Sequence, residues 1–321
     1  MGESIAPLLL TNADMREADA RTMAAGTPSY TLMTRAGAAV AEAAVAMAGG
    51  PGPGGILVVC GPGHNGGDGL VAARLLAEHG HEVAVALLGP AERTRGDAAR
   101  ALSEWRGPLV AADAITPARA GLVVDALFGS GLDRDLEDLP RGVVERLNAA
   151  RRPILAVDMP SGIDGDTGAV RGAAVRAART VTFAARKPGH LLHPGRAHCG
   201  PVTVADIGIT EATVAELGSR TFVNRPELWR KGFPQPEASG HKYGRGHALV
   251  LSGDAAHTGA ARLAARGALR AGAGLVTLAS PTDALAVNAS QLTAVMLRPC
   301  DGPEELAAIL SDARINAVAL G

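Results

Sequence analysis

The segment VVCGPGHNGGDGLVAARLL, residues 58–76, decides the fold of this chain. Its apolar start is typical of a buried strand, and its alanine- and leucine-rich end is typical of an amphipathic helix. Between them we expect a loop with glycines at positions 61, 63, 66, 67 and 69. A strand, a glycine loop and a helix in this order direct backbone N–H groups and the positive helix end at an anion, typically a phosphate. The alternative is a tight left-handed turn that holds no ligand.

The loop differs from two common phosphate-binding loops. No Lys-Ser/Thr pair follows it, so it is not a Walker A loop, and His64, Asn65 and Asp68 interrupt the dehydrogenase fingerprint. An acid inside a phosphate cradle is costly unless it binds a hydroxyl or a cation. We therefore expect Asp68 to face one of these groups.

Outside this segment the same alternation continues. Apolar runs at residues 55–60, 82–88, 121–128 and 152–160 alternate with alanine-rich stretches long enough for helices. Two later runs, 180–185 and 201–209, have strand composition and are separated by a loop rich in glycine, proline and histidine. This alternation predicts a parallel sheet covered on both faces, hence a Rossmann-like three-layer α/β/α domain over residues 1–215. Two helices are expected before the first strand, at 12–24, with Asn12 as N-cap, and at 31–47.

A second β-α pattern follows a break in periodicity. Residues 216–240 are proline-containing with little apolar pattern and are predicted to be a linker. Beyond it we expect strands at 246–253, 274–280 and at the chain's end, and helices at 258–272 and near 303–312. Because residues 241–321 stop on a strand that ends in glycine, where ligand loops normally begin, we expect this α/β unit to be incomplete.

Composition excludes several classes of protein. The formal net charge of −1 provides no basic field for a nucleic acid. No window reaches the roughly 18 to 20 apolar residues needed to cross a membrane, and the start MGES lacks signal-peptide and myristoylation features. The cysteines, Cys60, Cys199 and Cys300, are too far apart to suggest a disulfide framework or a zinc knuckle. A cytoplasmic location is expected.

Longer motifs carry a specific resemblance. In order, the chain contains LMTRAG (32–37), CGPGHNGGDGLVAARLL (60–76), VDALFGSGLDRD (124–135), AVDMPSGIDGDTG (156–168) and TVTFAARKPGHLLHPG (180–195). This set resembles the N-terminal domain of the YjeF family, the NAD(P)H-hydrate epimerases. Residues 241–281, HKYGRGHALVLSGDAAHTGAARLAARGALRAGAGLVTLASP, resemble the start of the ADP-dependent NAD(P)H-hydrate dehydratases, which have a ribokinase-like fold. Together they resemble the bifunctional NAD(P)H-hydrate repair enzymes of bacteria.

The resemblance implies an activity and a substrate site. The activity is epimerisation of the R and S forms of hydrated NADH and NADPH, NAD(P)HX. The substrate-binding positions that it implies are His64, Asn65, Gly66, Gly67, Asp68, Gly129, Ser130, Gly131, Leu132, Asp133, Arg134, Asp135, Asp158 and Lys187. His64 stands where the family has asparagine, and a histidine can still donate one hydrogen bond. The 129–135 loop would line the phosphate and ribose.

The resemblance also implies a potassium ion held by Asn65, Asp125 and Ser161. An amide oxygen, a carboxylate and a hydroxyl at three strand ends form a hard oxygen site suited to a monovalent cation. The alternative for Asp125 is a cap on a helix or loop.

Asp158 is the expected catalytic residue. It ends the run ILAVD and precedes a proline, so its carboxylate should lie at the carboxyl edge of the sheet, where ligands bind in such folds. By resemblance it contacts the hydrated ring, whose nitrogen can expel the neighbouring hydroxyl if an acid protonates the departing oxygen. One carboxyl that donates and recovers a proton suffices. The alternative is an aspartate that caps the PSG turn.

Three other features have simpler interpretations. Lys187 fits a contact to the phosphate or the ring, with a solvated loop lysine as the alternative. A zinc site at His190, His193 and His198 is disfavoured because the loop has no helical register and no acidic third ligand. Asp164 and Asp166 resemble part of a calcium loop but lack its final glutamate, so turn residues are expected.

The second unit adds a further expectation. By resemblance, Ala260 would contact the hydrated nucleotide and ADP would serve as the dehydratase cofactor, but the glycine-rich anion loops are expected beyond Gly321, so no dehydration is expected. A non-catalytic Rossmann-like module that binds a nucleotide or a protein is the alternative to an epimerase. An NAD-dependent dehydrogenase is disfavoured because the sequence lacks the dehydrogenase fingerprint. A sugar kinase is disfavoured because it would need the part of the second unit that is expected beyond Gly321. A homo-oligomer is left open.

Overall fold

The computed structural model describes residues 8–50, 54–235, 237 and 239–320. The chain divides into two compact units after Arg225, inside the segment predicted to be a linker. The expectations for residues 1–7 and for the terminal Gly321 lie outside the described residues. Within the described ranges, no helix is long and apolar enough to cross a membrane.

The first unit is built on a seven-stranded, wholly parallel sheet with the order β3-β2-β1-β4-β5-β6-β7. Its strands are β1 Ile56–Cys60, β2 Val83–Leu87, β3 Leu109–Ala111, β4 Leu122–Ala126, β5 Ile154–Val157, β6 Arg179–Phe183 and β7 Val202–Ala205. The chain runs outward from β1 to β3, then crosses back to β4 on the other side of β1. The strand order therefore reverses between β1 and β4, the place where ligands bind in such sheets.

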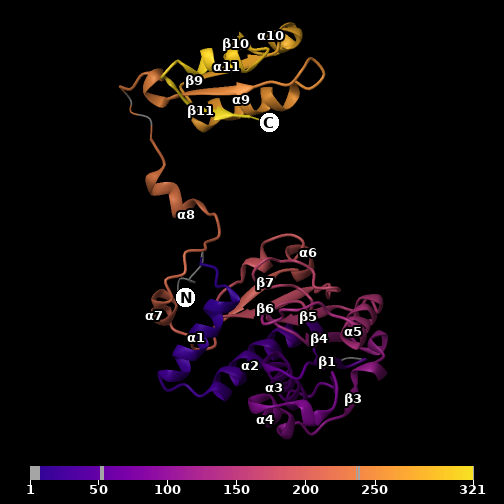
Figure 1. The fold of residues 1–321 in the computed structure, drawn as a ribbon. Helices are drawn as coiled ribbons and strands as arrows, with labels where there is room; N and C mark the ends of the chain where they lie inside the picture. The colour runs from indigo at the N-terminus through magenta and orange to yellow at the C-terminus, as the bar shows by residue number, and fades with distance from the viewer. Residues whose placement is uncertain (1–7, 51–53, 236, 238, 321) are drawn as a thin grey trace. The chain divides into compact units, whose positions relative to one another are not determined.

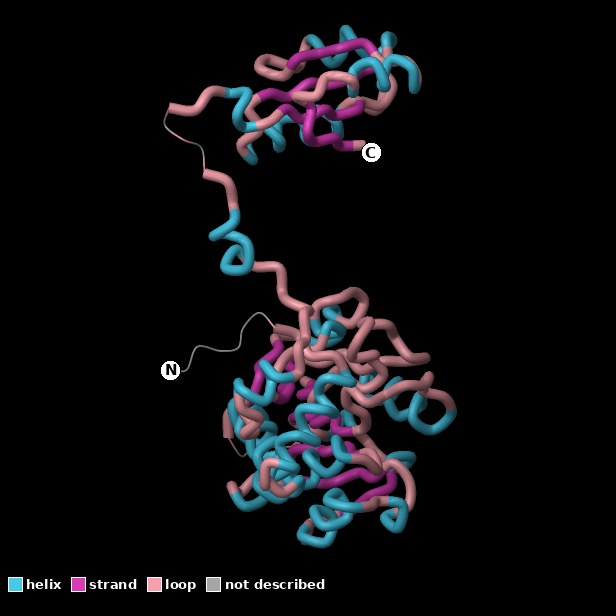
Figure 2. The backbone as a smooth tube through the Cα atoms, turned by 60° about the vertical axis from the view of Figure 1, so that its left-hand side comes forward, coloured by secondary structure: helices cyan, strands magenta, loops and turns pink. Residues whose placement is uncertain are grey.

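Helices cover both faces of this sheet, as Figures 1 and 2 show. They are α1 Asn12–Ala24, α2 Ser29–Ala48, α3 His64–Glu78, α4 Gly96–Glu104, α5 Asp138–Ala149, α6 Arg196–Cys199 and α7 Glu211–Glu216. Neighbouring residues of one strand belong to different cores, because side chains alternate across a sheet. Val58 packs with α2 and α3, whereas Val59 packs with Val143 and Leu147 of α5. The predicted three-layer α/β/α fold is confirmed.

Two local predictions are wrong. The expected glycine loop is largely helix, because α3 already begins at His64. None of its glycines has a positive φ, so the left-handed turn is also excluded. Gly66 is instead required by close approach, since a Cβ there would collide with the carbonyl oxygen of Gly61. The N-cap of α1 is Thr11 rather than Asn12, because Thr11 and Asp14 form a reciprocal capping box.

The second unit, taken by itself, contains a four-stranded parallel sheet with the order β10-β9-β8-β11. Its elements are α8 Pro226–Trp229, β8 His247–Leu251, α9 Gly259–Ala271, β9 Leu275–Ser280, α10 Leu285–Ala289, β10 Met296–Pro299, α11 Pro303–Leu310 and β11 Ile315–Ala319. Val250 packs with Ala265 of α9 on one face, and Leu249 packs with Ile309 of α11 on the other. The sequence pattern missed β3 and β10, which are short and mostly exposed edge strands.

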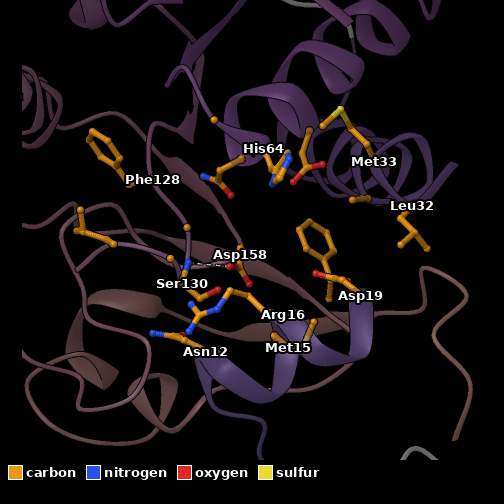
Figure 3. Close-up of a pocket in the computed structure, with 18 of the residues that line it drawn as sticks. Asn12, Met15, Arg16, Asp19, Leu32, Met33, His64, Phe128, Ser130 and Asp158 are labelled. Carbon is orange, nitrogen blue, oxygen red and sulfur yellow. Dashed lines mark hydrogen bonds between the residues drawn. The ribbon is translucent and has the colours of Figure 1, made fainter. Parts of the chain in front are cut away.

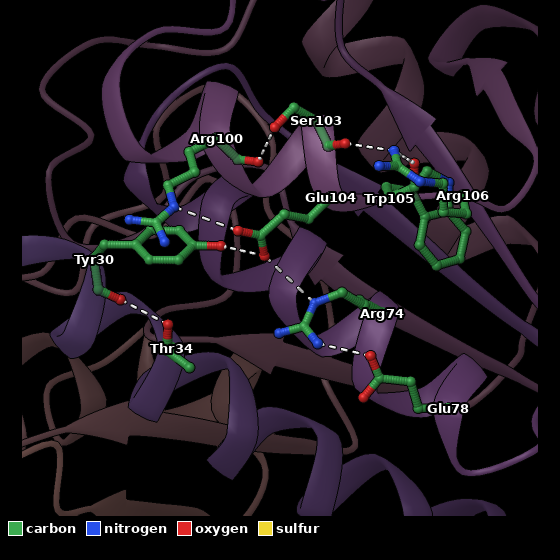
Figure 4. Close-up of polar contacts among 9 residues, drawn as sticks. All are labelled: Tyr30, Thr34, Arg74, Glu78, Arg100, Ser103, Glu104, Trp105 and Arg106. Atoms are coloured by element: carbon green, nitrogen blue, oxygen red, sulfur yellow. Dashed lines mark hydrogen bonds and ion pairs between the residues drawn. The ribbon is translucent and has the colours of Figure 1, made fainter.

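A polar network joins three helices of the first unit (Figure 4). Glu104 of α4 accepts a hydrogen bond of 2.6 Å from the Tyr30 hydroxyl of α2 and lies 3.6 Å from Arg74 of α3. The Arg100 guanidinium stacks 3.8 Å from the centre of the Tyr30 ring. Burial, and then the Glu104 carboxylate, raise the pKa of Tyr30 to about 12, so its hydroxyl remains a donor. The network fixes the helices that carry one wall of the site.

The contact between α2 and α3 leads to a stability prediction. A Cβ at Gly37 would lie 2.5 Å from Cβ of Val71, so Gly37→Ala must push the two helices apart. We expect the free energy of unfolding to fall by about 1–3 kcal/mol. Gly142→Ala in α5 is the matched control, because its Cβ would meet open space. It should be neutral or stabilise by up to about 1 kcal/mol, from helix propensity.

Denaturant unfolding of both variants measures this difference. Equal stabilities for Gly37→Ala and Gly142→Ala would show that the two helices are not in tight contact.

Candidate functional site

A cavity of about 530 Å³ opens at the carboxyl ends of the central strands of the first unit. Its walls come from α1, α2, the start of α3, the loop after β4 and the residues that follow β5 (Figure 3). This is the edge at which the strand order reverses between β1 and β4. Position and size both suit a nucleotide-sized ligand.

The structure brings most of the sequence-predicted substrate residues to this cavity. Those that line it are His64, Asn65, Asp68, Gly129, Ser130, Gly131, Leu132, Asp133, Arg134, Asp158 and Lys187. Gly66 and Gly67 do not line the cavity, because both are closely packed against other residues. A Cβ on Gly66 would collide with the Gly61 backbone, and one on Gly67 would collide with the Met33 side chain. Asp135 is exposed and outside the lining. Ala260 belongs to α9 of the second unit.

Asp158 is held by an ion pair and two further hydrogen bonds. It follows β5 with a φ of +63°, an uncommon conformation for a residue with a side chain. Its carboxylate accepts bonds from Lys187 Nζ at 2.7 Å, from the Thr182 hydroxyl at 2.9 Å and from the Ser130 N–H at 2.8 Å. Burial alone would raise the pKa of Asp158, but the Lys187 ammonium and these donors hold it well below its usual range. Asp158 is therefore a carboxylate.

Lys187 is only 1% exposed, so the alternative of a solvated loop lysine is wrong. Its ammonium also donates to the Thr182 hydroxyl at 2.8 Å. The His190 ring lies beside the pair: Nδ1 accepts from the Lys187 backbone N–H at 2.9 Å, and Nε2 lies 2.8 Å from the Asp158 carbonyl oxygen. Burial and the Lys187 charge lower the pKa of His190 to about 4. Neutral His190 thus positions the pair and has both ring nitrogens engaged.

The acidic loop at Asp164 is a turn, as expected. The Asp164 carboxylate accepts backbone hydrogen bonds from Asp166 and Thr167 and pairs with Arg171. Asp166 in turn accepts from the backbone N–H of Asn12, which ties this turn to the start of α1.

Two other cavity acids differ from Asp158 in the direction in which their pKa is shifted. Asp68 is 9% exposed, and burial, with the charges of Asp158 and Asp19, raises its pKa well above the usual value. Burial likewise raises the pKa of Asp19 to about 6. Acids whose pKa values are shifted in opposite directions within one cavity are typical of sites that do acid–base chemistry.

Sequence reasoning missed Asp19. It lies in α1, 45 positions before the start of α3, and belongs to none of the recognised motifs. The one available signal was the helical spacing of Met15, Ala18 and Thr22, which marks the buried face beside which Asp19 projects.

Asp125 and Ser161 lie beneath the cavity. Asp125 is fully buried, and its carboxylate accepts from the Ser161 hydroxyl at 2.6 Å and from the Ser161 N–H at 2.8 Å. Because its hydrogen-bond donors are neutral, burial raises the pKa of Asp125 to about 6. Asn65 lies in the first turn of α3, and its buried Nδ2 atom, a donor, has no hydrogen-bond partner in the described part of the chain. Because the described partners of the Asp125 carboxylate are neutral donors, and Ser161 contributes a hydroxyl oxygen, a monovalent cation would supply the missing countercharge.

Breaking the ion pair gives a second stability prediction. Lys187→Met leaves the buried Asp158 carboxylate unpaired, and we expect a loss of about 3–5 kcal/mol at pH 7. The double variant Lys187→Met/Asp158→Asn should recover most of this loss, because no buried charge remains. Chemical denaturation at pH 7 measures both values. Equal losses in the two variants would assign the effect to packing instead.

The Asp158–Lys187 ion pair makes the stability of the folded protein depend on pH. The pKa of Asp158 is lower in the folded than in the unfolded state. The pair therefore stabilises fully above the unfolded value of about 4 and loses its contribution as the pH falls below it. The wild type should lose stability toward acid more steeply than the double variant.

Comparisons with known proteins add to this geometry. The family described as YjeF-related protein N-terminus matches residues 29–189, and the family described as NAD(P)H-hydrate dehydratase matches residues 248–321. The bifunctional NAD(P)H-hydrate repair enzyme of Coxiella burnetii is 34% identical over 98% of this chain and 64% of its own length. The NAD(P)H-hydrate epimerase of Limosilactobacillus fermentum is 42% identical over 61% of this chain and 95% of its own.

A solved structure supports the fold. The crystal structure of the yeast protein ynu0, YNL200c, superposes with a TM-score of 0.56 at 24% identity, over 68% of this chain and 96% of the yeast chain. At that identity the likeness concerns the fold alone.

The expectation that the dehydratase unit is incomplete is not supported. The dehydratase family matches residues 248–321, and bifunctional relatives align over 98% and 99% of this chain. A dehydratase segment is thus present. The chain spans about half to two thirds of the length of the bifunctional relatives that it matches, with 48%, 64% and 62% covered in three of them.

Proposed function

Because the chain belongs to the YjeF-related family of NAD(P)H-hydrate repair proteins, we propose that its first unit interconverts the R and S forms of NAD(P)HX. The observation that carries this proposal is the cavity itself, in which the ion-paired Asp158 carboxylate and the start of α3 face the same space. The Asp158 carboxylate supplies charge for a reacting ring, and the start of α3 supplies the positive end of a helix for a phosphate.

The substrate is proposed to lie along these walls. His64 and Asn65, in the first turn of α3, contact the nucleotide, and the loop Gly129–Arg134 borders its phosphate and ribose. The hydrated ring lies toward Asp158 and Lys187. Apolar contact comes from Met33 and Phe183, which also line the cavity.

Epimerisation requires a planar, cationic form of the ring that water can reach from either face. When the hydroxyl leaves the carbon beside the ring nitrogen, the nitrogen lone pair forms a C=N bond and the ring becomes positive. Water then adds to either face. A carboxylate fixed before the reaction stabilises such a cation without reorganising. Because Asp158 is ionised and already accepts three hydrogen bonds, we revise its role from proton donor to stabiliser of the cation.

Asp158→Asn tests this function. The amide keeps the shape of the carboxylate but loses its charge, so we expect epimer exchange to fall about 10²- to 10³-fold while substrate binding stays measurable. Proton NMR of NADHX enriched in one epimer reports exchange, and equilibrium dialysis reports binding. Asp113→Asn, an exposed position outside the cavity, is the control. Wild-type exchange in Asp158→Asn would remove Asp158 from the mechanism.

We propose that Asn65, Asp125 and Ser161 hold a potassium ion, whose charge would neutralise the buried carboxylate and order the strand ends. Thermal unfolding tests this proposal independently of activity. Above saturation, each tenfold rise in potassium should stabilise the wild type by about 1.4 kcal/mol, and Asp125→Asn should not respond. Asp113→Asn should respond like the wild type. An identical response in Asp125→Asn, or in lithium at equal ionic strength, would contradict the site.

In potassium-free buffer, Asp125 also sets the direction in which stability changes with pH. The pKa of Asp125 is raised to about 6 on folding, so stability should fall as the pH rises from about 4 through 6. Asp125→Asn should remove this component.

The match over residues 248–321 favours a second candidate activity, ADP-dependent dehydration of S-NAD(P)HX. Ala260, at the start of α9, is the proposed contact to the hydrated nucleotide. Formation of NADH from the S epimer with and without ADP tests this candidate. Binding of NADHX with neither exchange nor dehydration above the buffer rate would favour the non-catalytic binding module.

A further inference from the structure

The Asp19 carboxyl lines the cavity and makes no hydrogen bond or ion pair within the described part of the chain. Figure 3 shows it projecting from α1 on the side of the cavity opposite α3, with Asp158 also facing the space. The carboxyls of Asp158 and Asp164, in contrast, each accept several protein donors. Asp19 is thus available to a ligand.

The helix that carries Asp19 is rigidly placed. Met15, Ala18 and Thr22 form its buried face, and the Thr11 capping box fixes its first turn. The backbone N–H of Asn12 donates to Asp166 at 2.7 Å, which anchors this end of the helix to the loop after β5. Asp19 is therefore presented to the cavity by a fixed element, as a catalytic group must be.

Asp158 and Asp68, the two buried acids among those that line the cavity, are poorly suited to move a proton. Asp158 is committed to Lys187, Thr182 and the Ser130 N–H. Asp68 is buried at the start of α3, and burial, with the charges of Asp158 and Asp19, raises its pKa well above the usual value, which suits a hydrogen-bond donor better than a group that must also recover the proton.

From this geometry we propose that Asp19 is the catalytic acid and base that donates a proton to the departing hydroxyl of the hydrated ring and takes one back from the adding water. The inference rests on the epimerase function proposed above and names the residue that this function still lacks.

The step balances without a redox partner. The protonated Asp19 carboxyl transfers its proton to the ring hydroxyl, the C–O bond breaks with its electron pair on oxygen, and water leaves. The ring nitrogen lone pair forms the C=N bond of the planar cation beside the Asp158 carboxylate. Water then attacks either face, and the Asp19 carboxylate accepts its proton. Enzyme and net composition are unchanged, and only the configuration at carbon differs.

The electrostatics agree with this role. Burial raises the pKa of Asp19 to about 6, and the charges of Lys187, Asp158 and His64 then act on it in opposing directions. Asp68, across the cavity, is also acted on by the Asp19 charge. A group that must both give and recover a proton works best with a pKa near the working pH.

Asp19→Asn tests the proposal, with Glu17→Gln as the matched control. Glu17 is on the same helix, pairs with Arg21 and does not line the cavity. Epimer exchange is followed by proton NMR, binding of NADHX by equilibrium dialysis, and folding by circular dichroism. We expect exchange in Asp19→Asn to fall about 10²- to 10⁴-fold with retained binding, Asp19→Glu to restore part of it, and Glu17→Gln to match the wild type.

The pH profile provides a readout that a structural role would not change. After subtraction of the uncatalysed rate, kcat/KM of the wild type should fall above a pH of about 6, since the free enzyme then loses the donating proton. The residual activity of Asp19→Asn should lack this fall at high pH. If Asp19→Asn folds poorly, two observations decide whether Asp19 moves the proton: the fall of wild-type kcat/KM above a pH of about 6, and the shift of that fall to another pH in Asp19→Glu.

Failure of the Asp19 proposal can be distinguished from failure of the proposed epimerase function. A wild type without exchange overturns the proposed epimerase function. A wild type with exchange and an equally active Asp19→Asn overturns the role of Asp19 alone, as does a wild-type profile with no fall above a pH of about 6. Loss in Asp68→Asn combined with full activity in Asp19→Asn would transfer the role to Asp68.

Discussion

The buried ion pair between Asp158 and Lys187 ties the strand ends around the cavity to one another. Asp158 follows β5, Lys187 lies in the loop after β6, and the Ser130 N–H that completes the carboxylate's donors comes from the loop after β4. His190 bonds to both residues' backbones. Three segments of the polypeptide thus converge on one carboxylate. Because a half-made network of this kind would leave a charge buried, it forms as a unit.

Burial, together with this pair, shifts the pKa values of Asp158, Asp68 and Asp19 in different directions. Lys187 compensates the Asp158 charge, whereas Asp68 and Asp19 share the cavity without a partner among the described residues and have raised pKa values. One carboxylate and two protonated or titrating acids result from residues of a single type. The difference lies in burial and neighbours. Such a division provides a fixed negative charge and an exchangeable proton in the same space.

Backbone packing decides how close the start of α3 comes to this space. Because Gly66 lies against the Gly61 carbonyl with no room for a Cβ, the first turn of α3 rests directly on the end of β1. His64 and Asn65 therefore enter the cavity from the helix itself and not from a flexible loop. The backbone N–H groups of a helix N-terminus are then available to an anionic ligand.

The sequence by itself determined the layered fold, the strands around the switch point and part of the cavity lining. These follow from apolar periodicity and from motifs that are contiguous in the chain, such as residues 58–76 and 124–135. Only the tertiary structure decided that Lys187 is buried against Asp158, and that Asp19 of α1 faces both. The charge state of a carboxyl depends on its burial and on charges brought near it by folding. These groups are separated by long stretches of chain, so no local pattern encodes which acid keeps its proton.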